Sequence, residues 1–422
     1  MPKTSRISNF YKLSPKERLK IIKEFGDLTD EEVALLSKEG NLKMDQANRM
    51  IENVIGFKSL PLGIATNFII NGKEYLIPMS IEEPSIVAAA SHAAKLARKT
   101  GGFTATHTEP IMIGQIQAVE VPNPEEAKKA IMKEKENIMK KANEQSSTLV
   151  KLGGGAKDLQ VRIIDSIKGP MVITELFVDC RDAMGANIVN TMCEAVAPMI
   201  EKASGGKIHL RIVSNLASKR VARAKVIYSK EVLGEEMIDG IVYAYAFAKA
   251  DPYRCTTHNK GVMNGIVAVG IATSQDIRAL EAGAHAYASR SGQYEPLTTW
   301  EKNKNGDLVG AIEIPIPVAT VGGATSTDPI AKICRKILGV KYATELAEIM
   351  ASVGLAQNFA AMRALATEGI QRGHMELHAR NIAIIAGATG KLIDEVAERM
   401  IKEKKVKVDR AKEILKKLKK KS

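Results

Sequence analysis

Two acids and a hydroxyl stand together at Glu82-Glu83-Pro84-Ser85, directly before an Ala-rich stretch that predicts a helix. A carboxylate there can exchange a proton with a substrate, and a serine hydroxyl can bind a polar group. The alternative is that these side chains only cap the helix and complement its dipole. Spacing alone favours capping.

A second polar group is Arg254-Cys255-Thr256-Thr257-His258-Asn259-Lys260-Gly261. The arginine and lysine cations of this stretch can hold a carboxylate, and a lysine ammonium can also stabilise the oxygen of a polarised carbonyl. The competing interpretation is a polar loop on the solvated surface. Asp276, sixteen residues after Lys260, precedes a predicted helix and would ordinarily cap it.

Asp182-Ala183-Met184-Gly185-Ala186-Asn187 joins the end of a predicted strand to the start of a helix. Backbone N–H groups at such a helix start can bind a pyrophosphate. The segment lacks the G-x-G-x-x-G spacing of a dinucleotide fingerprint, so alone it is a weak signal.

Two histidines, His374 and His378, share one face of a predicted helix. The glutamate of the zinc motif His-Glu-x-x-His is missing, so no metal is expected. A titratable histidine is a suitable general acid near neutral pH. Arg372-Gly373, just before it, is either a hinge or the end of a helix.

Local signals predict the elements around these groups. Ser14 to Glu17 and Thr29 to Glu32 are capping boxes, which start helices. Asn71-Gly72 lies between two apolar runs, 64–70 and 73–79, and predicts a hairpin with a type I′ turn. A helix is expected from Pro84 to about Lys99.

Residues 111–216 show a β-α-β-β-α-β order, which is that of a ferredoxin-like module. The expected elements are strands at 111–121, 159–165, 171–179 and 208–213, and helices at 124–150 and 186–203. The flanking segments resemble one interrupted unit, so this module is interpreted as an insertion.

The predicted fold class is therefore α+β, with a large, mostly helical substrate domain interrupted by a small nucleotide-binding domain. The large domain comprises 1–110 and 217–373, and its second part carries helices at 230–249, 277–288, 328–338, 341–352 and 355–370. The small domain is 111–216. Residues 374–422 form a C-terminal helical flap.

Composition is that of a folded globular protein, with 45% apolar and 26% charged residues among 422. No apolar stretch reaches the roughly 18 residues of a membrane helix, and the N-terminus lacks a signal peptide. A soluble, cytoplasmic protein is expected. Four cysteines without a Cys-x-x-Cys pair are expected to be buried small side chains rather than zinc ligands or disulfides.

The net charge of +13 raises the possibility of nucleic-acid binding, but its distribution argues against this. Residues 401–422 hold 11 Lys or Arg and 3 Asp or Glu, so most of the excess lies in this tail. The tail also has an apolar stripe at Val408, Ala411, Leu415 and Leu418, which predicts an amphipathic helix. Its cations can instead attract the phosphates of a ligand.

Together these stretches resemble the 3-hydroxy-3-methylglutaryl-CoA reductases, in particular their soluble, class II type of bacteria and some archaea. The resemblance covers nearly the whole chain and rests on several motifs in order: Glu52-Asn53-Val54-Ile55-Gly56, Glu82 to Ser85, Asp182 to Asn187, Glu281 to Ala286, Thr257 to Gly261, Val321 to Thr325 and Gly373 to Met375. It implies reduction of HMG-CoA to mevalonate and CoA with two hydrides from NADPH and/or NADH, without a metal.

The resemblance also implies residue roles. The catalytic positions are Glu83, Lys260, Asp276 and His374. The substrate carboxylate and hydroxyl are expected at Ser85, Arg254, Thr257 and Asn264. The cofactor is expected at Ser146, Asp182, Ala183, Met184, Gly185, Ala186, Asn187 and Asn215. Glu52 to Gly56 is implied as a dimer-interface segment, with the active site between two chains of a homodimer or an oligomer of dimers.

Three departures from the family pattern bear on these roles. Thr273-Ser274-Gln275-Asp276 replaces the commoner Thr-Gly-Asn-Asp. Tyr11 stands where a basic residue often contacts CoA, with Lys12 and Lys16 as substitutes. Ser146 stands where NAD-preferring members have an acid, which predicts use of NADPH with some tolerance of NADH.

Within this resemblance, Lys260 stabilises the oxyanion that forms on the thioester. Asp276 beside Lys260 and Glu83 keeps the lysine charged, His374 protonates the departing thiolate, and Glu83 protonates the final alkoxide. Three alternatives stay open at this point. They are a CoA-thioester lyase or binding protein without redox chemistry, a nucleic-acid binder, and the same reductase oxidising mevalonate in catabolism.

Overall fold

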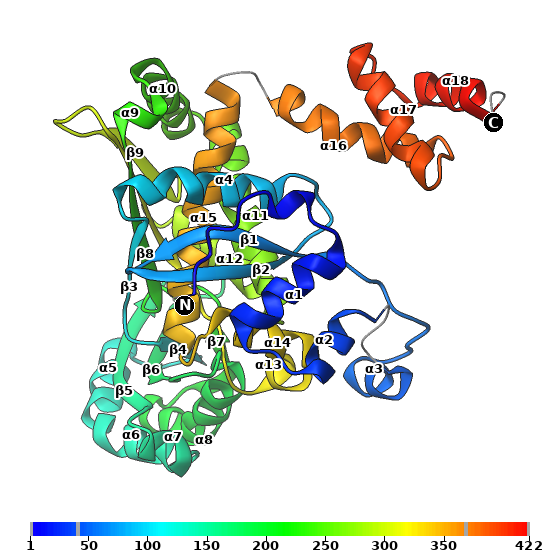
Figure 1. The fold of residues 1–422 in the computed structure, drawn as a ribbon. Helices are drawn as coiled ribbons and strands as arrows, with labels where there is room; N and C mark the ends of the chain where they lie inside the picture. Colours follow the sequence, from blue (N-terminus) through cyan, green and yellow to red (C-terminus); the bar gives the residue numbers. More distant parts are fainter. Residues whose placement is uncertain (1–2, 39–42, 367–369, 420–422) are drawn as a thin grey trace.

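Two β-sheets and the helices packed around them make up the main body of the chain in this computed structural model (Figure 1). The structure describes residues 3–38, 43–366 and 370–419, and for residues 370–377 it describes the backbone only. The larger sheet has six strands in the order β2-β1-β3-β8-β10-β9, and the smaller has four in the order β5-β6-β4-β7. The architecture is therefore mixed α and β.

The large sheet is built from segments on both sides of residues 111–216. Its strands are β1 (Leu62–Ile70), β2 (Lys73–Ser80), β3 (Phe103–His107), β8 (Val221–Tyr228), β9 (Thr298–Lys302) and β10 (Leu308–Pro315). β3 pairs antiparallel with β8. The chain thus leaves the sheet after β3 and re-enters it beside the same strand at β8, the arrangement expected of an inserted unit.

The hairpin predicted at Asn71-Gly72 is confirmed. Ile70 pairs with Lys73 across the turn, and both turn residues have positive φ, 51° and 77°. These are the backbone angles that a type I′ turn requires, and Asn and Gly adopt them at low cost.

The helices of the large unit include more than the predicted ones. They are α1 (Pro15–Gly26), α2 (Asp30–Leu36), α3 (Met44–Met50), α4 (Ile86–Ala97), α9 (Lys230–Leu233), α10 (Glu235–Ala250), α11 (Pro252–Ala272), α12 (Ile277–Ala288), α13 (Gly323–Thr327), α14 (Pro329–Leu338) and α15 (Ala343–Ala366), with 3-10 turns at Phe10–Lys12 and Arg98–Thr100. Both predicted capping boxes are present, at Ser14 and Thr29. α15 packs against β3, β8 and β10, and α11 lies between α15 and β2.

The second half of the large domain is mostly helical, as predicted, but it also supplies three strands that the prediction missed, β8, β9 and β10. β8 alternates small or apolar residues with Arg223 and Lys225, so its inner side chains are buried and its outer ones exposed. The two helices expected at 341–352 and 355–370 are one continuous helix, α15, which is buried over most of its length.

The small unit comprises β4 (Ile111–Val119), α5 (Pro124–Lys133), α6 (Lys135–Asn143), α7 (Ser147–Lys151), β5 (Gly155–Ile164), β6 (Met171–Asp179), α8 (Ala186–Ser204) and β7 (Lys207–Ser214). Its strand pairs are all antiparallel. The single helix predicted at 124–150 is broken into three, because the backbone leaves the helical conformation at Glu134 and Ser146. The unit has its own apolar core, drawn from residues 112–217.

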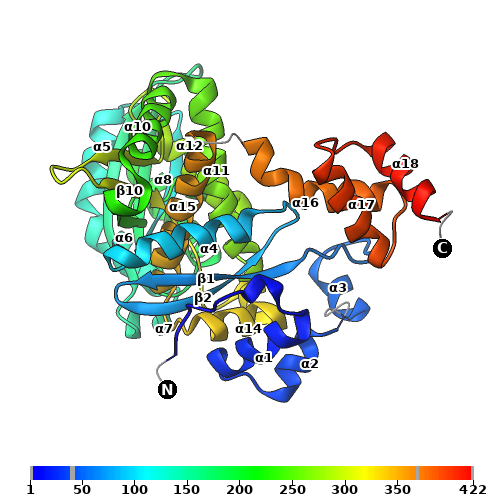
Figure 2. The same ribbon diagram turned by 45° about the horizontal axis from the view of Figure 1, so that its top comes forward.

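The C-terminal helices α16 (Ile370–Ile385), α17 (Lys391–Lys402) and α18 (Val408–Lys419) extend to one side of the sheets (Figures 1 and 2). They share a third apolar core between residues 379 and 418. Gly373 lies inside α16, so its interpretation as a helix end was wrong. The predicted amphipathic tail is confirmed, since Ala411, Leu415 and Leu418 are buried in this core.

Candidate active site

Lys260 and Glu83 form the centre of the candidate site. The Lys260 Nζ donates to Glu83 Oε2 over 2.8 Å. Their side chains are 58% and 37% exposed, so a ligand can reach both. Lys260 lies on α11 and Glu83 between β2 and α4, and α11 packs directly on β2. Two groups 177 residues apart are therefore brought together by the packing of one helix on one strand.

The polar stretch from Arg254 to Gly261 is not a loop but the start of α11. Asp251 begins the helix by accepting a hydrogen bond from the Arg254 N–H over 2.7 Å, and Pro252 occupies the first turn. Three of the predicted substrate-binding residues and the predicted catalytic lysine are spaced by three, three and four positions along α11, which places them on one helix face. They are Arg254, Thr257, Lys260 and Asn264.

The opposite face of α11 is buried and explains the other polar residues of the motif. His258 Nε2 lies 2.7 Å from Thr298 Oγ1. The Asn259 amide spans two backbone groups, the Glu295 carbonyl and the Leu297 N–H, at 2.9 Å each. These bonds fix the helix to the segment leading into β9. His258 and Asn259 therefore hold the helix in position, which the sequence analysis missed.

Burial also decides the charge of His258, which is 1% exposed. Loss of solvent, with a smaller contribution from the nearby Arg254 cation, lowers the pKa of His258 to about 3. The ring is neutral at physiological pH. Lys260 and Arg254 are thus the cations of this helix that face the site.

Asp276 lies four residues beyond the C-terminal end of α11, whereas Lys260 is in the first half of that helix. It caps α12, where its Oδ1 accepts from the N–H groups of Arg278 and Ala279 at 3.1 Å each, as the capping alternative predicted. Each helical residue advances by about 1.5 Å, so the stretch from Lys260 to Ala272 alone spans roughly 18 Å. Within one chain Asp276 is therefore engaged as the cap of α12, and its place beside Lys260 stays a prediction for a site shared between two chains.

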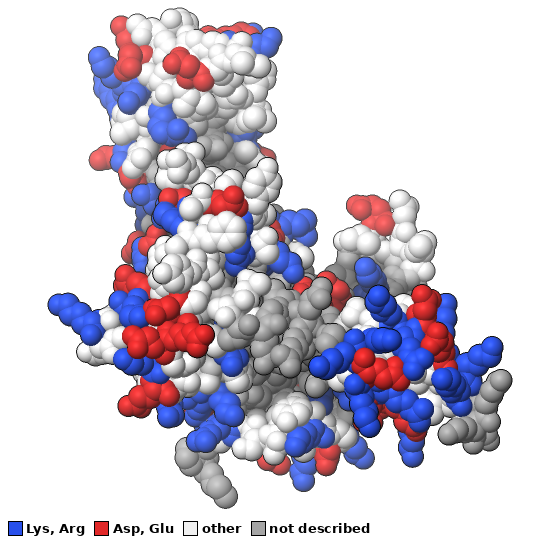
Figure 3. Space-filling model, turned by 90° about the horizontal axis from the view of Figure 1, so that it is seen from above, with Lys and Arg blue, Asp and Glu red and all other residues white. Residues whose placement is uncertain are grey.

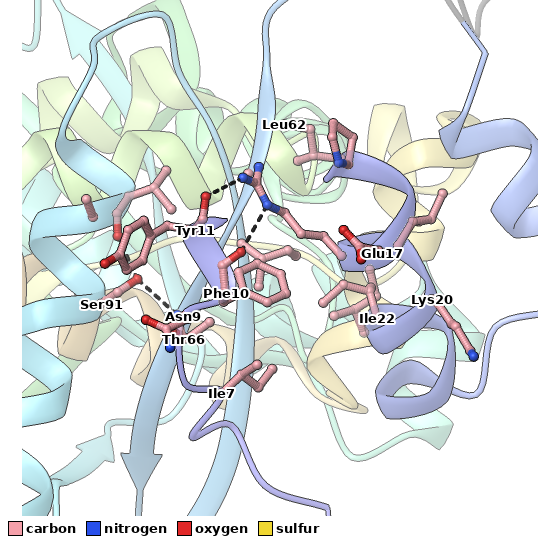
Figure 4. A pocket seen from close by; sticks show the side chains of 18 of the residues that line it. Ile7, Asn9, Phe10, Tyr11, Glu17, Lys20, Ile22, Leu62, Thr66 and Ser91 are labelled. Carbon is pink, nitrogen blue, oxygen red and sulfur yellow. Dashed lines mark hydrogen bonds between the residues drawn. The ribbon is translucent and has the colours of Figure 1, made fainter. Parts of the chain in front are cut away.

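Ser85 is the N-cap of α4 and has a φ of 77°, which is uncommon for a residue other than glycine. It lines a cavity of about 1690 Å³ that extends to α1 and α2 (Figure 4). A typical small-molecule pocket measures roughly 300–1,000 Å³. This cavity can therefore take a long ligand that ends near Ser85.

Cations are numerous around this cavity: Arg6, Lys16, Arg18, Lys20, Lys23 and Lys95. Tyr11 also lines it, with 74% of its surface exposed. Arg18 holds the backbone of this turn through the carbonyls of Phe10 and Tyr11, at 3.1 and 2.8 Å (Figure 4). The lining therefore combines several positive charges with an accessible ring, features that suit a phosphorylated ligand.

The segment Asp182 to Asn187 leads into the N-terminus of α8. The cap is Gly185, with a φ of 109°, and a Cβ there would lie 2.5 Å from Cys180 Sγ. Since glycine has no side chain to engage the first N–H groups of Ala186 and Asn187, these donors stay available to an anion. The structure thus fits binding of a pyrophosphate at this helix start.

Asp182 has a different contact from the one expected. Its Oδ1 accepts from the Ala343 N–H over 2.8 Å, at the start of α15. Its carbonyl accepts from the N–H groups of Thr320 and Val321. Asp182 therefore ties the turn before α8 to the large unit.

Arg220, which the sequence analysis missed, holds the same turn. It is 5% exposed, and its guanidinium donates to the carbonyls of Ala183, Met184 and Val318 at 2.9, 3.1 and 2.6 Å. Burial lowers its pKa, and acidic neighbours such as Asp179 oppose the shift. Nothing in the Ser218-Lys219-Arg220 sequence distinguishes this buried cation from an exposed one.

Ser146 caps α7, where its hydroxyl accepts from the Leu149 N–H over 3.3 Å. Lys140 and Lys141 precede it on α6, and Lys141 pairs with Glu144 at 3.1 Å.

Asn215 follows β7 and lies against α12, where a Cβ on Gly283 would approach its carbonyl to 2.7 Å. His374 lies on α16, and its side chain is outside the described residues.

Surface charge and cysteines agree with the sequence analysis. On the face seen in Figure 3, Lys and Arg crowd the C-terminal helices but alternate with Asp and Glu. Arg410, for example, pairs with Glu403 and Glu413.

All four cysteines are free and buried, as predicted. Across the described ranges, no helix is both long and apolar enough to cross a membrane.

Comparison with known proteins gives one consistent result. The family model of hydroxymethylglutaryl-coenzyme A reductase matches residues 14–379. The 3-hydroxy-3-methylglutaryl-coenzyme A reductase of Archaeoglobus fulgidus is 60% identical over 98% of this chain and 95% of its own length. A probable member from Borreliella burgdorferi is 36% identical over 89% of this chain and 86% of its own length.

Solved structures agree. The class II 3-hydroxy-3-methylglutaryl-CoA reductase of Streptococcus pneumoniae, bound to NADPH in open conformations, has a TM-score of 0.82 at 41% identity, covering 96% of this chain and 100% of that one. A second structure of the Streptococcus pneumoniae enzyme has a TM-score of 0.84 and covers 97% and 99%. This chain belongs to the hydroxymethylglutaryl-coenzyme A reductase family, and it is an oxidoreductase.

Proposed function

We propose that this protein reduces 3-hydroxy-3-methylglutaryl-CoA to mevalonate and CoA, using two molecules of NADPH, with NADH as a poorer substitute. The observation that carries the proposal is the Lys260–Glu83 pair on the α11 face that also bears Arg254, Thr257 and Asn264. Each NADPH would supply one hydride, so the oxidised cofactor would leave and a second NADPH would bind between the two reductions.

In the first reduction, the Lys260 ammonium stabilises the negative charge that develops on the thioester oxygen. Arg254 binds the free carboxylate of the substrate, and the polar side chains of Ser85, Thr257 and Asn264 hold its carboxylate and hydroxyl. The oxyanion then collapses, the C–S bond breaks, and mevaldehyde stays in the site while CoA leaves as a thiolate. His374 is proposed to give this thiolate its proton.

In the second reduction, Lys260 again stabilises the oxygen of a carbonyl, now that of mevaldehyde. The resulting alkoxide takes a proton from Glu83, which the 2.8 Å contact holds beside Lys260. Two hydrides and two protons thus convert the thioester to a primary alcohol and a thiol. The cavity between Ser85 and α1 is proposed to hold the CoA chain, with its phosphates near Lys16, Lys20 and Lys23.

The cofactor is proposed to lie on the small unit. Its strand order, β5-β6-β4-β7, together with the helices between β4 and β5 and between β6 and β7, supports a ferredoxin-like module. The uncapped start of α8 supports pyrophosphate binding there. We keep 1–110, 111–216, 217–373 and 374–422 as the proposed domain limits. Two apolar clusters within the large domain, one in the small domain and one among the C-terminal helices support this division.

A homodimer with shared sites is part of the proposal. Lys260 lies in the first half of α11 and Asp276 four residues beyond its last residue, roughly 18 Å further along the helix, so in this proposal a site that contains both takes Asp276 from a second chain. The stretch before β1 is also unusually exposed for apolar residues, with Ile51 at 65%, Ile55 at 99% and Phe57 at 49%. Exposed apolar patches of this kind mark interaction sites.

The experiment is a steady-state assay with HMG-CoA and each cofactor, run in both directions. Two NADPH consumed for each mevalonate formed is the expected result. A lyase would release CoA without consuming NADPH, and an enzyme adapted to mevalonate catabolism would work efficiently only in the oxidative direction. Either outcome would replace the proposal.

A further inference from the structure

A short irregular segment, Ile316–Val321, lies between the turn before α8 and the loop that carries Asp276. On one side, Arg220 donates to the Val318 carbonyl over 2.6 Å, and the Asp182 carbonyl accepts from the Thr320 N–H over 2.9 Å. On the other side, the Gln275 side chain forms hydrogen bonds with the next residue, Ala319. Both Val318 and Ala319 are buried.

Gln275 holds Ala319 at two points. Its Oε1 accepts from the Ala319 N–H over 2.7 Å, and its Nε2 donates to the Ala319 carbonyl over 2.9 Å. The same Nε2 also reaches the Thr273 carbonyl at 3.0 Å. A side-chain amide with both ends engaged has few alternative positions, so the backbone on either side of Gln275 is held as well. Asp276 is the next residue.

The neighbouring residue strengthens this attachment. Ser274 has a φ of 52°, and its hydroxyl donates to the Asp328 carboxylate. Thr325 donates to the Ser274 carbonyl over 3.1 Å. The departure Ser274-Gln275 therefore adds side-chain contacts to the 319–328 region that a Gly-Asn pair, without a hydroxyl and with a shorter amide, would not make in the same way.

We infer that Gln275 is a positioning residue for Asp276, and that Ile316–Val321 sets Asp276 at a fixed place relative to the nucleotide turn at Ala183-Met184. The link is a continuous series of hydrogen bonds from Gln275 to Ala319, then from Val318 to Arg220, and from Arg220 to Ala183 and Met184. The inference rests on the proposed function, because it assumes that Asp276 is catalytic and that the turn binds the cofactor. Small displacements of catalytic groups are costly, on the order of 100-fold for 1 Å.

The test is a double-mutant cycle between Gln275→Leu and Asp276→Asn, with kcat for HMG-CoA reduction and the Kd for NADPH measured separately. Gln275→Leu should lower kcat by about tenfold or more and leave the Kd for NADPH within about twofold. In the Asp276→Asn background the same change should cost less than about twofold, since the group that Gln275 positions is already gone. If the fold losses in kcat of the two single variants multiply in the double variant, the inference is overturned.

Two further variants separate positioning from general stability. Gln275→Asn keeps the amide but is one methylene shorter, so a smaller loss of kcat is expected, and it carries the test if Gln275→Leu does not fold. Asn71→Gly is the matched control, because Asn71 grips Ala105 through its N–H and carbonyl at 2.8 and 3.0 Å. Glycine tolerates the φ of 51° there. The control should lower stability and leave kcat unchanged.

Failure of the inference and failure of the proposed function give different results. In one case the wild type turns over HMG-CoA with NADPH while the fold losses in kcat of Gln275→Leu and Asp276→Asn multiply in the double variant. This result contradicts the positioning role alone and leaves the proposed function intact. An Asp276→Asn protein as active as wild type overturns it too, because Gln275 would have no catalytic group to position. Absence of any NADPH-dependent turnover by the wild type contradicts the proposed function, and the inference with it.

Discussion

Lys260 has a single close acidic partner among the described residues, Glu83, and the pair is open to solvent rather than buried. Exposed pairs of this kind contribute little to stability, about 0–1 kcal/mol. The pairing of a lysine with a glutamate here, and the place of Lys260 on the polar face of α11, are therefore better explained by ligand chemistry than by folding.

Lys260→Ala should abolish turnover, because removing an oxyanion donor costs on the order of 3 kcal/mol or more. The melting temperature should change little. Lys249→Ala is the matched control, since Lys249 is a half-exposed lysine paired with Glu295 just before the same helix. The assay is kcat/KM with HMG-CoA for both variants, and activity of the Lys260 variant within tenfold of wild type would contradict its role.

His258 connects the same motif to pH-dependent stability. Its folded pKa of about 3 lies below the roughly 6.5 of an unfolded histidine, so folding disfavours protonation. Its neutral form supports stability fully above pH 6.5. That support is lost as the pH falls from about 6.5 towards 3, by at most ~1.4 kcal/mol per pH unit.

Urea unfolding between pH 7.5 and 4.5 measures how the free energy of unfolding depends on the protonation of His258. His258→Asn should be less stable at neutral pH but should show a flatter decline of the unfolding free energy with falling pH. His209→Gln, at an exposed position on β7, is the control and should follow the wild-type slope. An unchanged slope for His258→Asn would show that other groups set the acid sensitivity.

At the scale of elements, the sequence predicted what depends on local signals. The Asn71-Gly72 turn, both capping boxes, β6 and α12 follow from residues within a few positions of one another. α11 could not be predicted in this way, because the polar residues His258 and Asn259 are buried through partners near Thr298, forty residues away. The pairing of Lys260 with Glu83 came only from the family resemblance.

β8 is a different case, because its signal was present in the sequence. Val221 to Tyr228 alternates inward apolar residues with Arg223 and Lys225, which is the period of a half-buried strand. Neither Arg220 nor Gln275 had such a signal. Their importance depends on backbone carbonyls and N–H groups of distant loops, which no side-chain pattern records.

The cap of α7 sharpens the prediction about cofactor choice. Ser146→Asp adds a charge that disfavours a 2′-phosphate, and Asp is as good an N-cap as Ser, so α7 should stay folded. The ratio of kcat/KM values should shift towards NADH by about tenfold, or ~1.4 kcal/mol. Ser147→Asp, one residue further along α7, is the control. A wild type that rejects NADPH, or an unchanged ratio in Ser146→Asp, would refute the role of Ser146.

At the scale of the whole molecule, the length of α11 imposes the strongest constraint. One chain presents Lys260 with Glu83 at one place and Asp276, with the nucleotide turn, at another. The exposed apolar side chains of Ile51, Ile55 and Phe57 provide a surface for a second copy. In the proposed enzyme, each catalytic site therefore combines Lys260 of one chain with Asp276 of the other.

Subunit complementation tests this most directly. Lys260→Ala and Asp276→Asn proteins, each with at most a small residual activity as a homodimer, are mixed in equal amounts, allowed to exchange subunits, and assayed with HMG-CoA and NADPH. Half of the dimers then are mixed, and one of their two sites has both wild-type groups, so about a quarter of wild-type activity should return. A mixture that stays inactive after mass spectrometry has shown the mixed dimers to be present would contradict the shared site.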